Sequence, residues 1–253
     1  MTWIEAIILG ILQGITEFLP VSSSGHLVIG KALLGIDIKE DVTFEIVVHA
    51  ATVCSTIIIF RKDIAELVKG LFKLQYNDEK SYVAKLFFSA IPVILVGFLW
   101  IDSVEGFFSG NLLLVGGMLL TTSFLLTFTY LFKPKNKSIT FIDALIIGIA
   151  QAIAVLPGLS RSGTTIATAL ILKNKREEAA RFSFLMVILP ILGKVFLDVI
   201  SGEHVSSQVD LATLVIGFVA AFVTGLFACK IMISIVKKSK LIYFAIYCVL
   251  VAI

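Results

Sequence analysis

Two stretches of the chain carry the residue types that could perform chemistry. The first runs from Glu17 to His26 and reads EFLPVSSSGH, and the second runs from Pro157 to Thr165 and reads PGLSRSGTT. Together they bring a carboxylate, an imidazole, a guanidinium and several hydroxyls into long apolar surroundings. Ionisable groups at membrane depth are costly, so they are functional candidates. We therefore expect the two stretches to form one functional site.

Each stretch opens an apolar segment with small hydroxyl residues, as at the N-terminus of a short helix. Such a terminus offers unpaired backbone N–H groups and a positive dipole end, which together bind anions. The second stretch adds Arg161, whose planar guanidinium suits bidentate contact with phosphate oxygens. Helix capping would explain the hydroxyls alone, but it does not call for the charged groups. The candidate anion-binding residues are Ser22, Ser23, Ser24 and Gly25, and Ser160, Ser162, Thr164 and Thr165.

Glu17 lies four residues after Gln13, so both side chains project from one face of the same helix. Their oxygens suit Mg²⁺ or Ca²⁺ better than a soft metal. The carboxylate could instead handle a proton, or it could pair with Arg161 for structure alone. Ser23, with His26 nearby in the sequence, fits nucleophilic catalysis in which an imidazole accepts or donates a proton. Phosphoryl transfer is the reaction class that these residues favour.

The composition predicts an integral membrane protein. Of the 253 residues, 58% are hydrophobic and only 15% are charged, whereas a soluble domain carries about a quarter charged residues. The mean hydropathy is +1.02. The basic residues form short clusters between apolar runs, which argues against a nucleic-acid partner and leaves membrane lipids as the surroundings.

A membrane crossing takes about 20 apolar residues. We predict six crossings, at 43–60, 83–101, 111–132, 182–200, 211–236 and 241–253. Two pairs of shorter apolar segments, 3–19 with 26–36 and 140–156 with 163–173, are interrupted by Pro and Gly. Re-entrant segments are tolerated where protein buries them. The predicted fold is therefore all-α, with six transmembrane helices and two re-entrant helix–loop–helix pairs.

The two broken pairs are related by an internal repeat. Gln13, Ser24 and Gly25 match Gln151, Ser162 and Gly163 at one constant offset. Each half then consists of one broken pair and three crossings, so the second half must enter the membrane from the opposite side. This pattern predicts one membrane domain, 1–253, built from inverted repeats at 1–132 and 139–253, with its site at mid-membrane.

Lys and Arg set the orientation because they concentrate in cytoplasmic loops. The segments 61–81, 133–138, 173–181 and 237–240 are basic, whereas 102–110 and 201–210 contain no Lys or Arg. This asymmetry places both termini outside the cell. The first broken pair then enters from the outer face and the second from the cytoplasmic face, so their loops could meet inside the bilayer.

Polar groups outside the two stretches have more ordinary explanations. Glu45 and His49 share one face of the first predicted crossing and could surround the site, although Glu45 could equally be a solvated helix end. Lys194 and Asp198 are also four apart, which predicts a local ion pair at the membrane interface.

The motifs resemble those of a known family. The run from Gln13 through Glu17 to His26 resembles the first signature of the bacterial undecaprenyl-diphosphate phosphatases, the bacitracin-resistance family. The run from Pro157 to Thr165 is similar to the second, Pro-Gly-x-Ser-Arg-Ser-x-x-Thr. The departures are Gln at 13, within the family's own Glu/Gln alternation, and Ser rather than Thr at 24.

The resemblance implies hydrolysis of a C55 isoprenyl diphosphate to the monophosphate in the bacterial inner membrane, recycling the lipid carrier for peptidoglycan synthesis. It suggests Ser23 as nucleophile, His26 and Glu17 as acid/base partners, and a divalent cation at Glu17 and Gln13. Arg161 would hold the diphosphate, flanked by Ser160, Ser162 and Thr165. The identity of the base, direct attack by water and the oligomeric state, with a homodimer among the options, stay open.

A transporter is the main alternative, because inverted repeats with broken helices are a transporter architecture. Such a protein would flip a phospholipid carrier or move an anion. Transport needs an anion site, but it does not need a nucleophile beside acid/base groups. The combination of Ser23, His26, Glu17 and Arg161 therefore favours an enzyme. A purely structural membrane scaffold would leave these groups unexplained.

Overall fold

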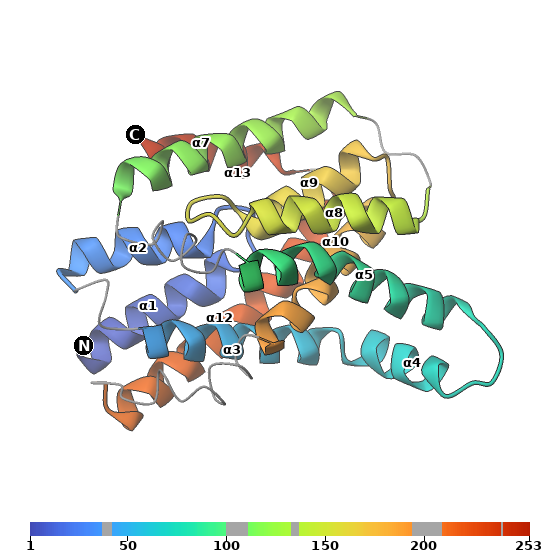
Figure 1. Ribbon diagram of the computed structural model, residues 1–253. Helices are drawn as coiled ribbons and strands as arrows, with labels where there is room; N and C mark the ends of the chain where they lie inside the picture. The colour runs from blue at the N-terminus through green and yellow to red at the C-terminus, as the bar shows by residue number, and fades with distance from the viewer. Residues whose placement is uncertain (37–41, 100–110, 133–136, 194–208, 239) are drawn as a thin grey trace.

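The computed structural model describes residues 1–36, 42–99, 111–132, 137–193, 209–238 and 240–253 (Figure 1). Within these ranges the regular structure is helical, with one isolated bridge between Lys137 and Asn174. The helices are α1 (Trp3–Thr16), α2 (Ser23–Leu34), α3 (Val42–Ile59), α4 (Arg61–Leu71), α5 (Asp78–Leu99), α7 (Leu112–Phe128), the 3₁₀ helix η2 (Thr129–Leu131), α8 (Phe141–Ile153), α9 (Arg161–Ile171), α10 (Arg176–Met186), α12 (Leu211–Lys237) and α13 (Ile242–Ala252).

Three helical segments are long and apolar enough to cross a membrane: Asp78–Leu99, Leu112–Leu131 and Leu211–Lys237. A fourth crossing is possible if α3 and α4, which bend by 76° at their junction, form one broken span. The all-α prediction is therefore confirmed for the part of the chain that the structure describes, and the protein is a multi-pass membrane protein.

The two predicted broken pairs are made of short helices. At 1.5 Å per residue, the 14 residues of α1 and the 13 residues of α8 fall short of the bilayer core. Their ends match as well. Thr2 and Thr140 each start a capping box, and Ser22 and Ser160 each cap the helix after the loop. Corresponding positions of the two pairs thus perform the same local task.

The predicted continuous crossing at 182–200 is wrong in its first part. Helix α10 begins earlier, at Arg176, and ends at Met186, and a turn at Val187 separates it from helical residues 188–193. Pro190 explains the break, because its ring clashes with the carbonyl four residues earlier and it has no N–H to donate. Lys194 and Asp198, predicted to form an ion pair, lie outside the described residues.

Close helix packing fixes the first loop. Helix α1 lies along α12 with Gly10 against the backbone of Gly217 and Gly14 against that of Ala221, where an added Cβ would come within 2.6 Å and 2.4 Å of a carbonyl oxygen. Small residues four apart let membrane helices approach in this way. Glu17, which follows the last turn of α1, is therefore held at a fixed distance from α12.

The second loop is held by α7. Thr122 of α7 accepts a hydrogen bond from the backbone N–H of Ser160 at 3.0 Å, and its own hydroxyl reaches the carbonyl of Gly158 at 3.3 Å. Gly158 has a φ of +92°, a conformation that suits glycine and allows the sharp turn before α9. Helix α13 packs on α7, where Ser123 donates to the carbonyl of Ala245.

Candidate active site

The two loops meet, as the sequence predicts. Gly25 lies against Gly158 so closely that an added Cβ would sit 3.0 Å from the Cα of Gly158. The Ser162 hydroxyl of the second loop donates to the carbonyl of Leu19 in the first loop at 3.1 Å. The N-termini of α2 and α9 therefore lie side by side, and each contributes free N–H groups and a positive helix end.

Glu17 is the centre of the contacts between the loops. Its Oε1 forms an ion pair with Arg161, and its Oε2 accepts from the Ser23 hydroxyl at 2.7 Å and from Gln13 Nε2 at 2.9 Å. His49 Nε2 lies 3.7 Å from the same Oε2. The Glu17 side chain is only 7% exposed. Four side chains from α1, α2, α3 and α9 thus converge on one buried carboxylate.

Ser23 is the hydroxyl of the first loop that contacts Glu17. Ser22 caps α2 by accepting from the N–H of Gly25, while Ser23 directs its hydroxyl to Glu17. Ser22 and Gly25 are buried, whereas Ser23 and Ser24 are partly exposed. Ser24 lies within 3.3 Å of the Ser22 hydroxyl. Ser23 is therefore reachable and polarised by a carboxylate, as a nucleophile must be.

In the second loop, the hydroxyls of Ser160, Ser162 and Thr165 are bonded within the protein, whereas the buried hydroxyl of Thr164 has no hydrogen-bond partner among the described residues. Ser160 caps α9 through the N–H of Gly163. Thr165 donates to the carbonyl of Arg161 and also contacts the Ser183 hydroxyl of α10. Capping and helix packing, the plainer explanation for such hydroxyls, accordingly account for Ser160 and Thr165. The side chain of Arg161 is 27% exposed, and its guanidinium lies beside Glu17.

His26 does not face Ser23. Its Nδ1 lies 2.8 Å from the carbonyl oxygen of Ser22, and its Nε2 lies 2.8 Å from the hydroxyl of Tyr247 on α13. Both ring nitrogens are therefore engaged away from the Ser23 hydroxyl. The family resemblance suggests both His26 and Glu17 as acid/base partners of Ser23. In the structure, the Ser23 hydroxyl contacts Glu17.

Comparison with known proteins identifies the family of the chain. Residues 6–253 match the family model described as bacitracin resistance protein BacA. The chain belongs to the BacA family. It is 57% identical over 252 residues to a protein of Bacteroides thetaiotaomicron named undecaprenyl-diphosphatase, with 98% of this chain and 96% of the relative covered. A Thermosipho africanus protein of the same name is 39% identical, with 98% and 96% covered.

In this BacA family member, the sequence predictions miss one charged contact beside the site. Lys31 of α2 is fully buried and lies 2.6 Å from Glu45 of α3, whose side chain is 31% exposed. Glu45 is thus the partner of a buried ammonium group rather than a solvated helix end. The four-residue spacing of Glu45 and His49 predicts that both residues lie near the site. The contact of His49 with Glu17 confirms this prediction for His49.

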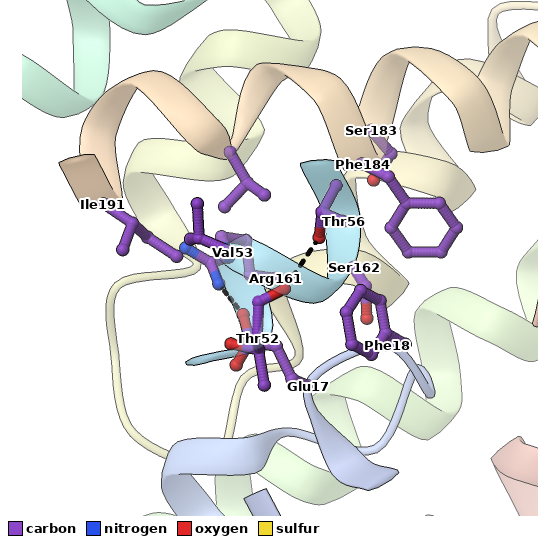
Figure 2. A pocket seen from close by; sticks show the side chains of 11 residues that line it. Glu17, Phe18, Thr52, Val53, Thr56, Arg161, Ser162, Ser183, Phe184 and Ile191 are labelled. Atoms are coloured by element: carbon purple, nitrogen blue, oxygen red, sulfur yellow. Dashed lines mark hydrogen bonds and ion pairs between the residues drawn. The ribbon is translucent and has the colours of Figure 1, made fainter. Parts of the chain in front are cut away.

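The BacA family site opens onto a small pocket (Figure 2). Glu17 and Arg161 line it together with Thr52, and the rings of Phe18 and Phe184 form an apolar wall. Its free volume of about 10 Å³ is enough for about one water molecule. The remaining lining residues are Val53, Thr56, Ser162, Ser183, Val187 and Ile191.

Gln13 leaves one polar atom of this site without a partner. Its side chain is fully buried, its Nε2 donates to Glu17, and its Oε1 has no hydrogen-bond partner among the described residues. Those residues contain no cluster of three or more His, Cys, Asp or Glu side chains that could hold a metal. A cation here would therefore need few protein oxygens and further ligands from elsewhere, as Mg²⁺ often does.

Proposed function

We propose that the protein is an undecaprenyl-diphosphatase, which hydrolyses undecaprenyl diphosphate to undecaprenyl phosphate and inorganic phosphate. The observation that carries the proposal is the Ser23 hydroxyl, 2.7 Å from a Glu17 carboxylate that Arg161 holds across the two loops. Membership of the BacA family and the name shared by its close relatives support the same reaction.

In the proposed reaction, Ser23 Oγ attacks the terminal phosphorus while its proton passes to Glu17 Oε2. The anhydride bond to the inner phosphate breaks, and undecaprenyl phosphate leaves with the bonding electron pair. A water molecule then attacks the phosphoserine, giving inorganic phosphate and returning the proton from Glu17 to Ser23. Attack by water without the phosphoserine is the alternative, and the pocket beside Glu17 has room for that water.

The positive groups of the site suit the charge of a diphosphate. Arg161 keeps donors beyond the one that contacts Glu17, because a guanidinium carries five N–H groups. The N-termini of α2 and α9 add backbone N–H groups on the same side. Charge that develops on the transferred phosphoryl group would be stabilised by donors already in place.

A divalent cation, Mg²⁺ or Ca²⁺, fits the residues present. The Glu17 carboxylate balances the charge of Arg161, so the pair carries little net positive charge to attract a diphosphate. The unpartnered Oε1 of Gln13 and the Glu17 carboxylate would hold the cation, with substrate phosphate oxygens and water as its other ligands. When bound, it would neutralise phosphate charge.

The proposed topology has six crossings and two re-entrant pairs, α1–α2 and α8–α9, in inverted repeats, with both termini and the opening of the site on the outer face. The matched caps of the two pairs support the repeat. The two termini lie at one end of the molecule and the α4–α5 connection at the other (Figure 1). That arrangement agrees with the placement of the basic segments.

The test is release of phosphate from C55 diphosphate by the purified protein in detergent. We expect release with Mg²⁺ or Ca²⁺, none after chelation, and loss in Ser23→Ala but not in Ser234→Ala, a control on the exposed face of α12. A quenched reaction should contain phosphoserine at position 23. No release by folded wild-type protein in either cation would contradict the enzyme, and a lipid-flux assay in liposomes would then test the transporter alternative.

A further inference from the structure

A hydrogen-bonded chain links the C-terminal helix to the residue before the candidate nucleophile. Tyr247 on α13 contacts His26 Nε2, and His26 Nδ1 contacts the carbonyl of Ser22, each at 2.8 Å. We propose that Tyr247 is a positioning residue for the hydrolysis, because through His26 it fixes the Ser22 backbone and so aims Ser23 at Glu17. The inference rests on the proposed function and adds a role that the motifs do not contain.

The hydrogen bonds define the tautomer of His26. A carbonyl oxygen can only accept, so Nδ1 must carry a proton. In a neutral ring Nε2 is then the acceptor, and the Tyr247 hydroxyl is the donor. The two rings are also nearly parallel, at 9° with centroids 5.6 Å apart. The Ser22 carbonyl therefore determines which nitrogen is protonated, and Tyr247 holds the orientation of the imidazole.

Ser22 needs this support because of its backbone conformation. Its φ of +69° lies in a region that residues with a side chain rarely adopt, so surrounding contacts must hold it there. Its carbonyl accepts from both the backbone N–H and the ring of His26. Ser23 follows directly, and a change in the Ser22 backbone would rotate the Ser23 hydroxyl away from Glu17.

Helix α13 contacts the first loop directly. Cys248, the next residue after Tyr247, is fully buried, with its thiol 3.7 Å from the carbonyl of Pro20 in the same loop. The Ser123 hydroxyl of α7 donates a hydrogen bond to the Ala245 carbonyl of α13 at 2.8 Å. Two consecutive side chains of α13 thus contact this region, Cys248 at Pro20 in the loop and Tyr247 at His26 in the first turn of α2.

The first experiment measures kcat and KM for C55 diphosphate in Tyr247→Phe, which removes one hydroxyl and keeps the ring. We expect kcat to fall about tenfold, the cost of losing one buried hydrogen bond, with KM within about twofold. Tyr243→Phe, one turn earlier on the same helix and 64% exposed, is the matched control and should match wild type. Unchanged kcat in Tyr247→Phe, or a rise in KM alone, would overturn the positioning role.

The second experiment observes His26 directly and does not depend on turnover. The chain contains three histidines, so ¹⁵N-imidazole spectra in detergent can be assigned by substituting each in turn. We expect a protonated Nδ1 and a bare Nε2 for His26 in wild type, with the Nε2 signal shifted in Tyr247→Phe and unmoved in Tyr243→Phe. A proton on Nε2 in neutral wild-type His26, or an unmoved signal in Tyr247→Phe, would overturn the proposal.

Variants of His26 separate positioning from proton transfer. His26→Asn can still donate an N–H to the Ser22 carbonyl, whereas His26→Ala cannot. If the ring acts through Ser22, His26→Asn should keep at least about tenfold more activity than His26→Ala; equal loss in both would overturn the proposal. Inactive wild-type protein with the expected His26 spectrum would instead overturn the proposed function. The positioning role of Tyr247 would then be overturned as well, because it depends on that function.

Discussion

Arg161 and Glu17, 144 positions apart in the sequence, form an ion pair that joins the two loops. The same carboxylate accepts the hydroxyl of Ser23. One side chain therefore both connects the halves of the site and polarises the candidate nucleophile. Stability and catalysis share this contact, and substitutions can separate them.

For Glu17→Gln we expect kcat to fall by about 10³, the loss typical of a general base. The substitution also leaves the Arg161 guanidinium without its carboxylate, so the free energy of unfolding should fall by about 2 kcal/mol. The double variant Glu17→Gln/Arg161→Met should regain most of that stability and none of the activity. Thermal unfolding in detergent and phosphate release measure the two effects.

The outcome that contradicts this assignment is a Glu17→Gln protein with near wild-type kcat. Arg161→Lys provides the companion test, since it keeps the charge and loses the planar fork of donors. We expect it to unfold close to the wild-type temperature while kcat falls by about 10². Equal losses of stability in Arg161→Lys and Arg161→Met would mean that the geometry of the guanidinium, not its charge, holds the loops together.

Much of this site was predictable from sequence because its residues sit in two short motifs. Glu17, Ser23 and Arg161 were predicted together, and the structure brings them together. The repeat also predicted where the short helices lie. These features depend on local spacing and on the cost of polar groups in apolar surroundings, and both can be recognised in one sequence.

The rest depends on contacts between distant segments. Tyr247 lies 221 positions from His26, and nothing in its local sequence distinguishes it from other aromatic residues of apolar helices. Lys31 appears near the end of a predicted helix, and its partner Glu45 belongs to a different element. The break at Val187 was missed because the apolar run continues through Pro190. Side-chain partners of this kind follow from tertiary packing.

The Lys31–Glu45 pair should respond asymmetrically to substitution. Lys31 is fully buried and Glu45 is 31% exposed. Glu45→Gln leaves a buried ammonium group without its counter-charge, which should cost about 3 kcal/mol of unfolding free energy. Lys31→Met leaves a carboxylate that can reach water and fills the same space, so we expect less than about 1 kcal/mol. Equal losses, measured by thermal unfolding, would show that the pair is solvated from both sides.

Gln13 is expected to set the affinity for the divalent cation. Gln13→Glu places a second carboxylate beside Glu17, and two such groups repel unless a cation lies between them. The Mg²⁺ concentration for half-maximal phosphate release should therefore fall, by about tenfold, and Gln13→Leu should raise it. A titration of Mg²⁺ into chelated protein measures both. Identical Mg²⁺ dependence in the three proteins would place the cation away from Gln13.

The packing of α1 on α12 should control the position of Glu17. A Cβ at Gly14 would lie 2.0 Å from the Thr224 hydroxyl oxygen and 2.4 Å from the Ala221 carbonyl oxygen. Gly14→Ala must push the helices apart, so we expect it to cost about 2 kcal/mol of stability and to lower kcat as Glu17 moves away from Ser23. Gly117→Ala on α7 is the control, since nothing lies within 4 Å of the added methyl group. It should be neutral or slightly stabilising, and a Gly14→Ala protein as stable and active as Gly117→Ala would mean that α1 does not depend on this close contact.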